Sequence, residues 1–442
     1  MCRLKEWEEK MKKRIRQLVA FAAITAMCAS LVSCGKKGDY VHGKKGYYSQ
    51  LDNGITTEVT KQGSGGCWAH ACTTSILTAS QICEGKVPDL VPYDIMKDTY
   101  QGHDGGEGWH YDYDVNVTGG GGIVVIDGLS NGIGEDGYVL VEAPFFGWPD
   151  QNDVPGNHAT KEEIQEIIRT KGAVTCALSF ANANFYGMDH GYLTLYDDPS
   201  NHHELHHEVC LVGWDDNFPK EYFGAEYRKE LPKSNGAWLA KDSQGADYGN
   251  DGYFWISYES NMMYDCLLHI SDKYSQVLSY DGGCMDTLDL PGDNIAANVF
   301  HQKGKLAAVG TQVGLIGIMG RENVYDRDLT TIKIEIRDAS MNEVLAKKEV
   351  SFDFPGYYVV ELDSPIEVED YSIVITYSAH IPLESEMLES HRDIYYVSGI
   401  EEGQSFVFKD GQWIDLASAD AKDIFGLEDT PNNVCIKALY VD

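Results

Sequence analysis

The sequence predicts an α+β domain followed by an all-β sandwich domain. Its 442 residues are enough for two or three domains of ordinary size. Residues up to about 275 mix helical periodicity with β-rich runs, whereas residues from about 280 onward form short alternating runs separated by turns. The composition, 43% hydrophobic and 11% aromatic, supplies buried cores and excludes disorder throughout the chain.

The charge balance argues against nucleic acid as a partner. The chain has 35 Lys and Arg against 69 Asp and Glu, which gives a formal net charge of −34. A surface of this sign repels a phosphate backbone. We therefore expect no nucleic-acid partner, and the function has to be inferred from motifs.

The first 33 residues have the layout of a secretory leader. A basic segment precedes an apolar run at residues 18–32, which is shorter than the ~20 residues that cross a bilayer. The run ends in LVSC, which resembles the lipobox of bacterial lipoproteins, and this resemblance implies that Cys34 is lipidated. The alternative is an ordinary leader with an incidental cysteine. We expect a lipoprotein signal peptide at residues 1–33, a tether at residues 34–47, and anchoring to the outer face of the cell membrane.

Eight cysteines lie beyond the leader, and their spacing indicates neither a disulfide scaffold nor a structural zinc module. They are scattered along the chain without CxxC pairs. We expect most of the following to be buried thiols: Cys67, Cys72, Cys83, Cys176, Cys210, Cys266, Cys284 and Cys435.

Periodicity places the elements of both domains. In the first domain, residues 48–275, helical spacing predicts helices over residues 67–83 and 161–171. The β-rich runs of this domain predict strands over residues 174–178, 208–214, 236–240 and 252–258. In the second domain, residues 280–442, a sandwich is expected from strands over residues 331–337, 343–352, 357–362, 371–377 and 434–441.

Cys67 has the sequence context of a nucleophile. It opens the first predicted helix, where the helix dipole lowers a thiol pKa, and glycines at residues 63, 65 and 66 allow a tight turn into that helix. His207 lies 140 residues downstream, within the separation of about 130–150 residues typical of one class of Cys–His peptidases. His70, one turn after Cys67, is interpreted as a helix-packing residue.

Three blocks resemble the papain family of cysteine peptidases, in that family's order. Residues 59–69 (VTKQGSGGCWA) resemble its nucleophile segment, residues 207–216 (HEVCLVGWDD) its histidine strand, and residues 238–243 with 251–254 the segment of its third catalytic residue. The resemblance implies a two-lobe domain over residues 48–275. Its helical lobe carries Cys67, and its barrel-like lobe carries His207 and Asp242.

The resemblance also implies a role for each site residue. Cys67 supplies a thiolate, His207 an imidazolium, Asp242 an orienting carboxylate, and the Gln62 side chain forms an oxyanion hole with the Cys67 N–H. These groups suit peptide hydrolysis through an acyl-enzyme without a cofactor or metal. A glycine run at residues 119–122, with residues 142–145 after it, resembles the wall that pairs with the substrate backbone. The implied substrate-binding residues are Gly65, Gly66, Gly121 and Gly122.

The sequence departs from the family at three positions. Gln62 stands five residues before Cys67, where six is usual. Asp242 replaces the usual Asn, although Asp orients the imidazole in other triads. Gln244 replaces the Trp that normally shields this position from water. These departures leave an alternative function, a catalytically inactive papain-like surface adhesin or glycan-binding protein.

A second motif belongs to a different chemistry. His203, Glu204 and His207 match the H-E-x-x-H pattern of zinc metallopeptidases. That pattern needs a helix, but the segment follows the turn-forming sequence DDPSN and precedes a β-rich run. A zinc metallopeptidase is therefore a lesser alternative.

The second domain resembles the lectin-like β-domain that follows such peptidases in bacterial surface proteins. Residues 279–283 (SYDGG) and 296–300 (AANVF) carry this likeness. It implies contact with cell-envelope glycan, and the alternative is a structural sandwich without a ligand. The leading hypothesis is an extracytoplasmic, lipid-anchored, thiol-dependent peptidase that acts on peptide or protein substrates.

Overall fold

The computed structural model of the chain describes residues 40–43, 45–55, 57–63, 66–99, 126, 128–132, 134, 137–147, 159–180, 185–186, 190–224, 231–316, 326–384, 399–427 and 431–442. The elements below belong to one compact unit formed by residues 42–188 and 192–442. The leader and Cys34 lie outside the described residues.

Two helices pack on the first sheet, and the sequence explains where α2 (Cys67–Glu84) ends and where α5 (Lys161–Thr170) begins. Helix α2 ends where Gly85 adopts a left-handed backbone, which closes the last turn. Helix α5 begins at a capping box between Thr160 and Glu163 and buries three isoleucines. The shorter helices are α3 (Pro92–Thr99), α6 (Ala421–Phe425) and the 3₁₀ turns η1 (Leu51–Asn53), η4 (Pro199–Asn201), η5 (Lys220–Phe223) and η6 (Arg327–Leu329).

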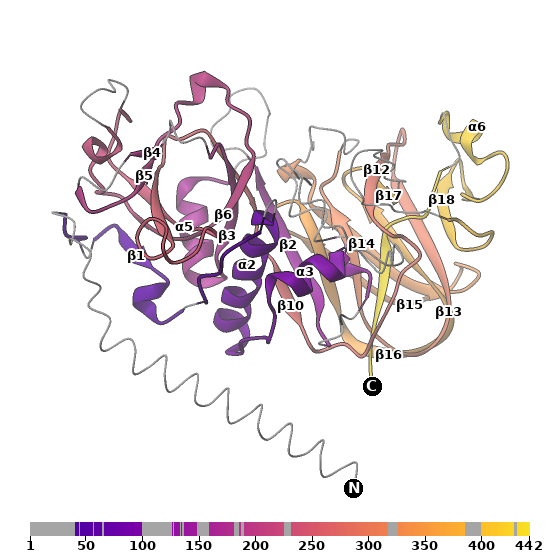
Figure 1. The fold of residues 1–442 in the computed structure, drawn as a ribbon. Coiled ribbons are helices and arrows are strands. Elements are labelled where there is room, and N and C mark those ends of the chain that lie inside the picture. Colours follow the sequence, from indigo (N-terminus) through magenta and orange to yellow (C-terminus); the bar gives the residue numbers. More distant parts are fainter. Residues whose placement is uncertain are drawn as a thin grey trace, which may run out of the picture. The chain divides into compact units, whose positions relative to one another are not determined.

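The first sheet is built around β6, a strand whose residues are all buried. β6 pairs with β1, β3 and β7, and α2 packs against β3 and β6 (Figure 1). The strands of this sheet are β1 (Tyr47–Ser49), β2 (Val139–Gly147), β3 (Val174–Leu178), β4 (Phe185–Tyr186), β5 (Thr194–Leu195), β6 (His207–Asp215), β7 (Ala237–Lys241), β8 (Tyr253–Ser257) and β9 (Met262–Cys266).

The second domain is almost entirely β. Its longest strands, β13 (Asn294–Val313) and β16 (Gly356–Tyr377), pair antiparallel along most of their length. The two strands expected at residues 357–362 and 371–377 are therefore one continuous strand. β10 (His269–Ser271) and β11 (Gln276–Leu278) precede this domain in the chain and join its sheet. The remaining strands are β12 (Cys284–Leu288), β14 (Thr331–Asp338), β15 (Val344–Ser351), β17 (Ile381–Glu384), β18 (Ser405–Lys409), β19 (Gln412–Asp415) and β20 (Ile436–Val441).

Strand β2 joins the two sheets. Phe145 and Gly147 pair with β9 of the first sheet, whereas the start of β2 pairs with β10 and its middle with β16 (Figure 1). Residues 142–145, expected beside the substrate-binding wall, lie within this shared strand, and the glycine run at residues 119–122 lies outside the described residues.

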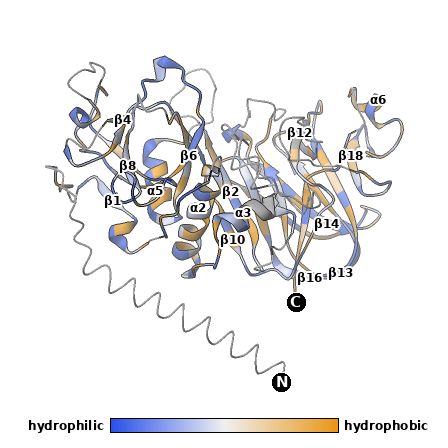
Figure 2. Ribbon diagram, viewed as in Figure 1, coloured by the Kyte–Doolittle hydropathy of each residue, from blue (hydrophilic) through white to orange (hydrophobic). Residues whose placement is uncertain are grey.

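Apolar clusters hold these layers, and three of them are large. One lies between α5 and the first sheet, and another fills the β-domain. A third combines Trp68, Cys72 and Ile76 of α2 with Leu315 and Tyr357 of the β-domain. Figure 2 shows hydrophobic and hydrophilic residues alternating along α2 and α5, as expected of helices that bury one face.

The cysteines beyond the leader are mostly buried, as expected. Six are buried, Cys67 is partly exposed, and Cys83 at the end of α2 is exposed. In the part of the chain that the structure describes, no helix is long and apolar enough to cross a bilayer.

Candidate active site

Cys67 is the first residue of α2. Buried Trp68, Ala69 and Ala71 fix this end of the helix in the core. The N–H groups of a first helical turn have no acceptor within the helix, so the Cys67 N–H is available to a ligand. Burial raises the pKa of the Cys67 thiol, but the hydrogen bond and the charge of His207 outweigh burial and hold the pKa below its ordinary value.

His207 and Asp242 stand at the ends of two paired strands. His207 opens β6, and Asp242 follows the last residue of β7. His207 Nε2 lies 2.9 Å from Asp242 Oδ1, which also accepts the Ser243 N–H at 2.7 Å. Because the carboxylate only accepts, Nε2 carries the hydrogen and Nδ1 is left for the thiol of Cys67.

The imidazole is held in its charged form. Its side chain is 6% exposed, and the Asp242 side chain is fully buried. Burial lowers the pKa of His207, but the hydrogen bonds to Asp242 and Cys67 outweigh this effect and raise the pKa to about 9. A lowered thiol pKa beside a raised imidazole pKa favours a thiolate–imidazolium pair near neutral pH. Such a pair supplies a nucleophile and a proton donor for a leaving amine.

Gln62 is held beside the site by Ser243. The Gln62 N–H donates to the Ser243 carbonyl at 2.7 Å, and the Ser243 hydroxyl donates to Gln62 Oε1. Because Oε1 is occupied as an acceptor, the Nε2 amide is the end of the side chain that can donate to an oxyanion. The loop has one residue fewer than usual before Cys67, and these two bonds tie it to the residue after Asp242.

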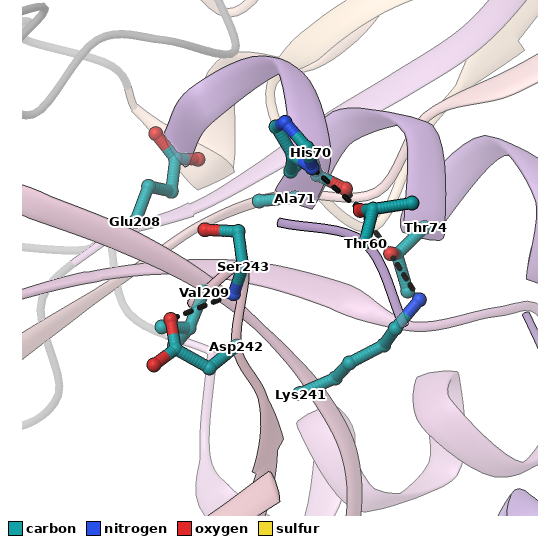
Figure 3. Close-up of a pocket in the computed structure, with 9 residues that line it drawn as sticks. All are labelled: Thr60, His70, Ala71, Thr74, Glu208, Val209, Lys241, Asp242 and Ser243. Carbon is teal, nitrogen blue, oxygen red and sulfur yellow. Dashed lines mark hydrogen bonds between the residues drawn. The ribbon is translucent and has the colours of Figure 1, made fainter. Parts of the chain in front are cut away.

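A buried lysine anchors the start of the same loop. The Lys241 ammonium donates to Thr57 Oγ1, to the Glu58 carbonyl at 2.7 Å and to Thr74 Oγ1 at 3.1 Å. Burial lowers the pKa of Lys241 to about 8. Figure 3 shows Lys241, Thr74 and Asp242 lining one small pocket, whose volume is about 10 Å³. Lys241 therefore ties the loop to both α2 and β7.

His70 lines the same pocket, and its hydrogen-bond partner there is Thr60. Its Nδ1 lies 2.6 Å from Thr60 Oγ1 (Figure 3). Burial and the nearby Lys241 charge lower the pKa of His70 to about 4. A neutral imidazole bonded to Thr60 fits the packing role expected for His70.

An acidic pair lies close to the sulfur of Cys67. Glu208 on β6 and Asp265 on β9 are 4% and 5% exposed and share a hydrogen bond. Burial, together with the charges of Asp265 and Cys67, raises the pKa of the Glu208 carboxyl well above its usual range. The raised pKa favours the neutral form of the Glu208 carboxyl beside Asp265 and Cys67.

The structure brings together four of the expected site residues: Cys67, His207, Asp242 and Gln62. Gly66, expected to bind substrate, caps α2 at its N-terminus and is buried. The other expected substrate-binding glycines, Gly65, Gly121 and Gly122, lie outside the described residues.

The H-E-x-x-H segment does not form the zinc-binding geometry. Residues 203–206 are not helical, and His207 starts a strand. His203 Nδ1 instead lies 2.7 Å from Asp197 Oδ1. Among the described residues, no group of three or more His, Cys, Asp or Glu has a geometry that suits a metal ion.

Comparisons with known proteins agree with this architecture. Residues 147–275 match the family described as papain family cysteine protease, and residues 279–440 match the lectin-like domain family. Cathepsin S of Bos taurus is 25% identical over 229 residues, which cover 47% of this chain and 59% of the relative. Cathepsin S of Mus musculus is 23% identical over 212 residues, with coverage of 46% and 55%. The chain thus spans less than two thirds of these relatives.

Two solved structures are similar over both domains. The clostridial cysteine protease Cwp84 after propeptide cleavage gives a TM-score of 0.64 at 19% identity, covering 89% of this chain and 98% of that chain. The cysteine protease and lectin-like domains of Cwp84, a surface layer associated protein of Clostridium difficile, give 0.61 at 18% identity, with coverage of 92% and 90%. At these identities the likeness shows the fold, and it confirms the predicted fold class. The chain therefore combines a papain-family cysteine protease domain with a lectin-like domain that follows it.

Proposed function

We propose that the protein hydrolyses peptide bonds with Cys67 as the nucleophile. In this mechanism the Cys67 thiolate attacks the scissile carbonyl, and the Cys67 N–H and Gln62 Nε2 donate to the resulting oxyanion. The His207 imidazolium then protonates the leaving amine, which releases an acyl-enzyme. Asp242 holds the imidazole in the tautomer that this transfer needs. Water, deprotonated by the neutral imidazole, hydrolyses the thioester and restores the pair.

One observation carries the proposal: the charged pair and its orienting carboxylate are assembled from three separate segments of the chain. The His207–Asp242 hydrogen bond and the opposite pKa shifts of Cys67 and His207 are what a working site needs. A surface adhesin with an inactive protease domain would have no requirement for these features.

Covalent labelling tests the proposal. We expect an epoxysuccinyl thiol-peptidase inhibitor to label the parent and a chelator to leave peptide hydrolysis unchanged. Cys67→Ala should abolish both labelling and hydrolysis. His203→Ala is the matched control, because its imidazole pairs with Asp197 away from the site. Hydrolysis that survives Cys67→Ala but stops with a chelator would favour the metallopeptidase alternative.

We also propose that the protein works outside the cytoplasm, anchored through lipid on Cys34. The leader pattern and the LVSC sequence support this location. The similar protein Cwp84 is described as surface layer associated. Two acyl chains would anchor the chain stably, and the lectin-like domain would then face cell-envelope glycan. Cys34→Ala should lose labelled palmitate and membrane attachment, and retention of both would contradict the anchor.

The domain limits belong to the same proposal. We place the protease domain at residues 48–275 and the lectin-like domain at residues 280–442. The boundary between the two domains is supported by the family matches, because the protease match ends at residue 275 and the lectin-like match begins at residue 279.

A further inference from the structure

The hydrogen bond between His207 and Asp242 lies under an aromatic side chain. The ring of Phe180 is centred 4.1 Å from the imidazole ring of His207, at an interplanar angle of 50°. The neighbouring rings of Phe185 and Tyr248 are centred 4.7 Å and 5.9 Å from that of Phe180. Phe180 therefore contacts the imidazole, and Phe185 and Tyr248 pack on Phe180.

Strand register explains why Phe180 reaches the imidazole. Leu178, the last residue of β3, pairs directly with His207 of β6. Directly paired residues point to the same face of a sheet, and so does a residue two positions further along. Phe180 is two positions beyond Leu178, so its side chain points to the same face of the sheet as those of Leu178 and His207.

The position that this family normally uses for shielding holds a different residue. Gln244, two residues after Asp242, stands where the family has Trp, and its backbone forms a β-bridge with Lys61. An amide side chain attracts water and cannot exclude it. Nevertheless, Asp242 is fully buried and the imidazole is 6% exposed. Another group must therefore exclude water, and Phe180 is the ring in contact with the imidazole.

We propose that Phe180 is a positioning residue that keeps water from the His207–Asp242 hydrogen bond and so replaces the shield lost at residue 244. A hydrogen bond to a charged group is stronger when water does not compete for donor and acceptor. The ring also limits rotation of the imidazole, which must present Nδ1 to Cys67. This inference rests on the proposed function but uses a readout that does not require turnover.

The environment of His207 determines the direction in which its pKa should change when Phe180 is replaced. The net effect of the site is to raise the pKa of His207 to about 9 from an ordinary value of 6.5. Admitting water relieves the burial that lowers this pKa, but it also weakens the hydrogen bonds to Asp242 and Cys67 that raise it. Because these bonds outweigh burial in the parent, we expect the pKa to move downward. The titratable groups that act on the imidazole are Cys67 on α2 and Asp242 after β7. Glu208, the next residue of β6, interacts with Cys67, and Tyr248 packs on Phe180. A substitution at residue 180 changes none of these residues.

The test compares four variants of the full chain: Phe180→Ala, Phe180→Leu, Phe185→Leu and the double variant Phe180→Ala with Gln244→Trp. Phe185→Leu is the control, because it keeps an apolar side chain that packs on Phe180 and Phe254, behind the ring that contacts the imidazole. The first readout is the downfield proton resonance of His207 Nε2–H, which is visible when exchange with water is slow. The second is the pH dependence of Cys67 alkylation by iodoacetamide.

We expect Phe180→Ala to broaden the proton resonance and to move the alkaline limb of alkylation down by about one pH unit. Turnover should fall about five- to tenfold, mainly through kcat. Phe180→Leu should show a smaller change of the same kind, and Phe185→Leu should resemble the parent. Tryptophan at residue 244 should restore both readouts in the Phe180→Ala background.

Several results would contradict the proposed role of Phe180. One is a parent with no downfield resonance, and another is a Phe180→Ala variant with an unchanged resonance and alkaline limb. A rise in KM alone would make Phe180 a wall of the substrate cleft instead. The double variant Phe180→Ala with Gln244→Trp could also fold but restore neither readout. That result would show that Phe180 does not take the place of a tryptophan at residue 244. Failure of the proposed function is distinguishable, because Cys67 would then resist the epoxysuccinyl inhibitor in the parent.

Discussion

At the residue scale, Asp242 holds His207 by charge as well as by hydrogen bond. We expect Asp242→Asn to retain most turnover, because the amide oxygen still accepts the Nε2 hydrogen. Loss of the negative charge should lower the pKa of His207 from about 9, so the alkaline limb of the pH–rate profile moves down. Asp242→Ala should lower turnover strongly. Superimposable pH profiles of the parent and both variants would show that Asp242 has no part in the reaction.

Ser243 offers a test of the shortened oxyanion loop. Its hydroxyl occupies Gln62 Oε1, so Ser243→Ala should free the amide to rotate and lower kcat about tenfold. Gln62→Ala removes the donor itself and should cost about 10²–10³ in kcat. Steady-state kinetics of the two single variants and the double variant check this coupling. If the two residues act together, Ser243→Ala adds little once Gln62 is gone, whereas fully additive losses would contradict the coupling.

The sequence predicts the site residues unevenly, for a physical reason. Cys67, His207 and Asp242 each lie in a contiguous block whose neighbours identify it. Phe180 lies outside such a block, because its role depends on the pairing of Leu178 with His207 across two strands. The acidic partner of Glu208 is likewise supplied by another strand. Contacts of this kind are set by register, which a single sequence does not state.

At the element scale, α2 approaches the turn between α5 and β3 very closely. A Cβ on Gly172 would stand 2.9 Å from the backbone N and Cα of Ala79 in α2. We expect Gly172→Ala to push this turn from the helix that carries Cys67 and to lower the free energy of unfolding by about 1–3 kcal/mol. Thermal unfolding measures the loss. Gly132→Ala is the control, since no atom lies within 4 Å of its added Cβ, and equal melting temperatures for the two variants would contradict the close packing.

The elements with a regular pattern are the ones that the sequence predicts well. The helix expected at residues 161–171 is α5, whose isoleucines at residues 164, 167 and 168 mark its buried face. β13 was not expected as one strand of 20 residues. Its middle, residues 301–305, is largely exposed and interrupts the apolar pattern, although the backbone pairing continues on both sides.

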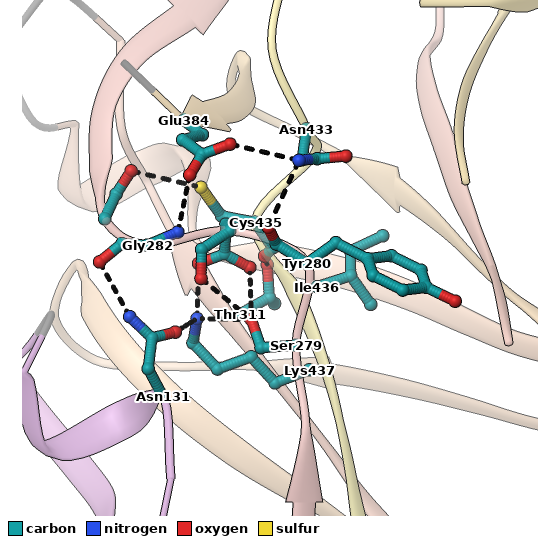
Figure 4. Close-up of polar contacts among 12 residues, drawn as sticks. Asn131, Ser279, Tyr280, Gly282, Thr311, Glu384, Asn433, Cys435, Ile436 and Lys437 are labelled. Atoms are coloured by element: carbon teal, nitrogen blue, oxygen red, sulfur yellow. Dashed lines mark hydrogen bonds and ion pairs between the residues drawn. The ribbon is translucent and has the colours of Figure 1, made fainter. Parts of the chain in front are cut away.

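At the scale of the whole molecule, the protease and lectin-like domains share a strand, a core and a polar network. Figure 4 shows Asn131, which precedes β2, reaching the β-domain: its amide donates to the Gly282 carbonyl at 2.7 Å and its oxygen accepts from Lys437. Lys437 also forms a buried ion pair with Asp281. Removing one partner of such a pair leaves an uncompensated buried charge, so this network favours one arrangement of the two domains. No sequence motif predicts that β2 is shared by the two sheets.

Gly356 tests whether the two domains stabilise each other. It pairs with Pro144 of β2, and an added Cβ would stand 2.2 Å from the Ala143 carbonyl oxygen. Because a backbone oxygen cannot rotate away, Gly356→Ala must separate β16 from β2 and loosen the core that Tyr357 shares with α2. We expect both domains to melt at a lower temperature, with faster hydrogen exchange in α2 and slower inhibitor labelling of Cys67. Gly399→Ala, with open space around its Cβ, is the control. If the β-domain alone loses stability while exchange in α2 is unchanged, the shared core does not support the nucleophile helix.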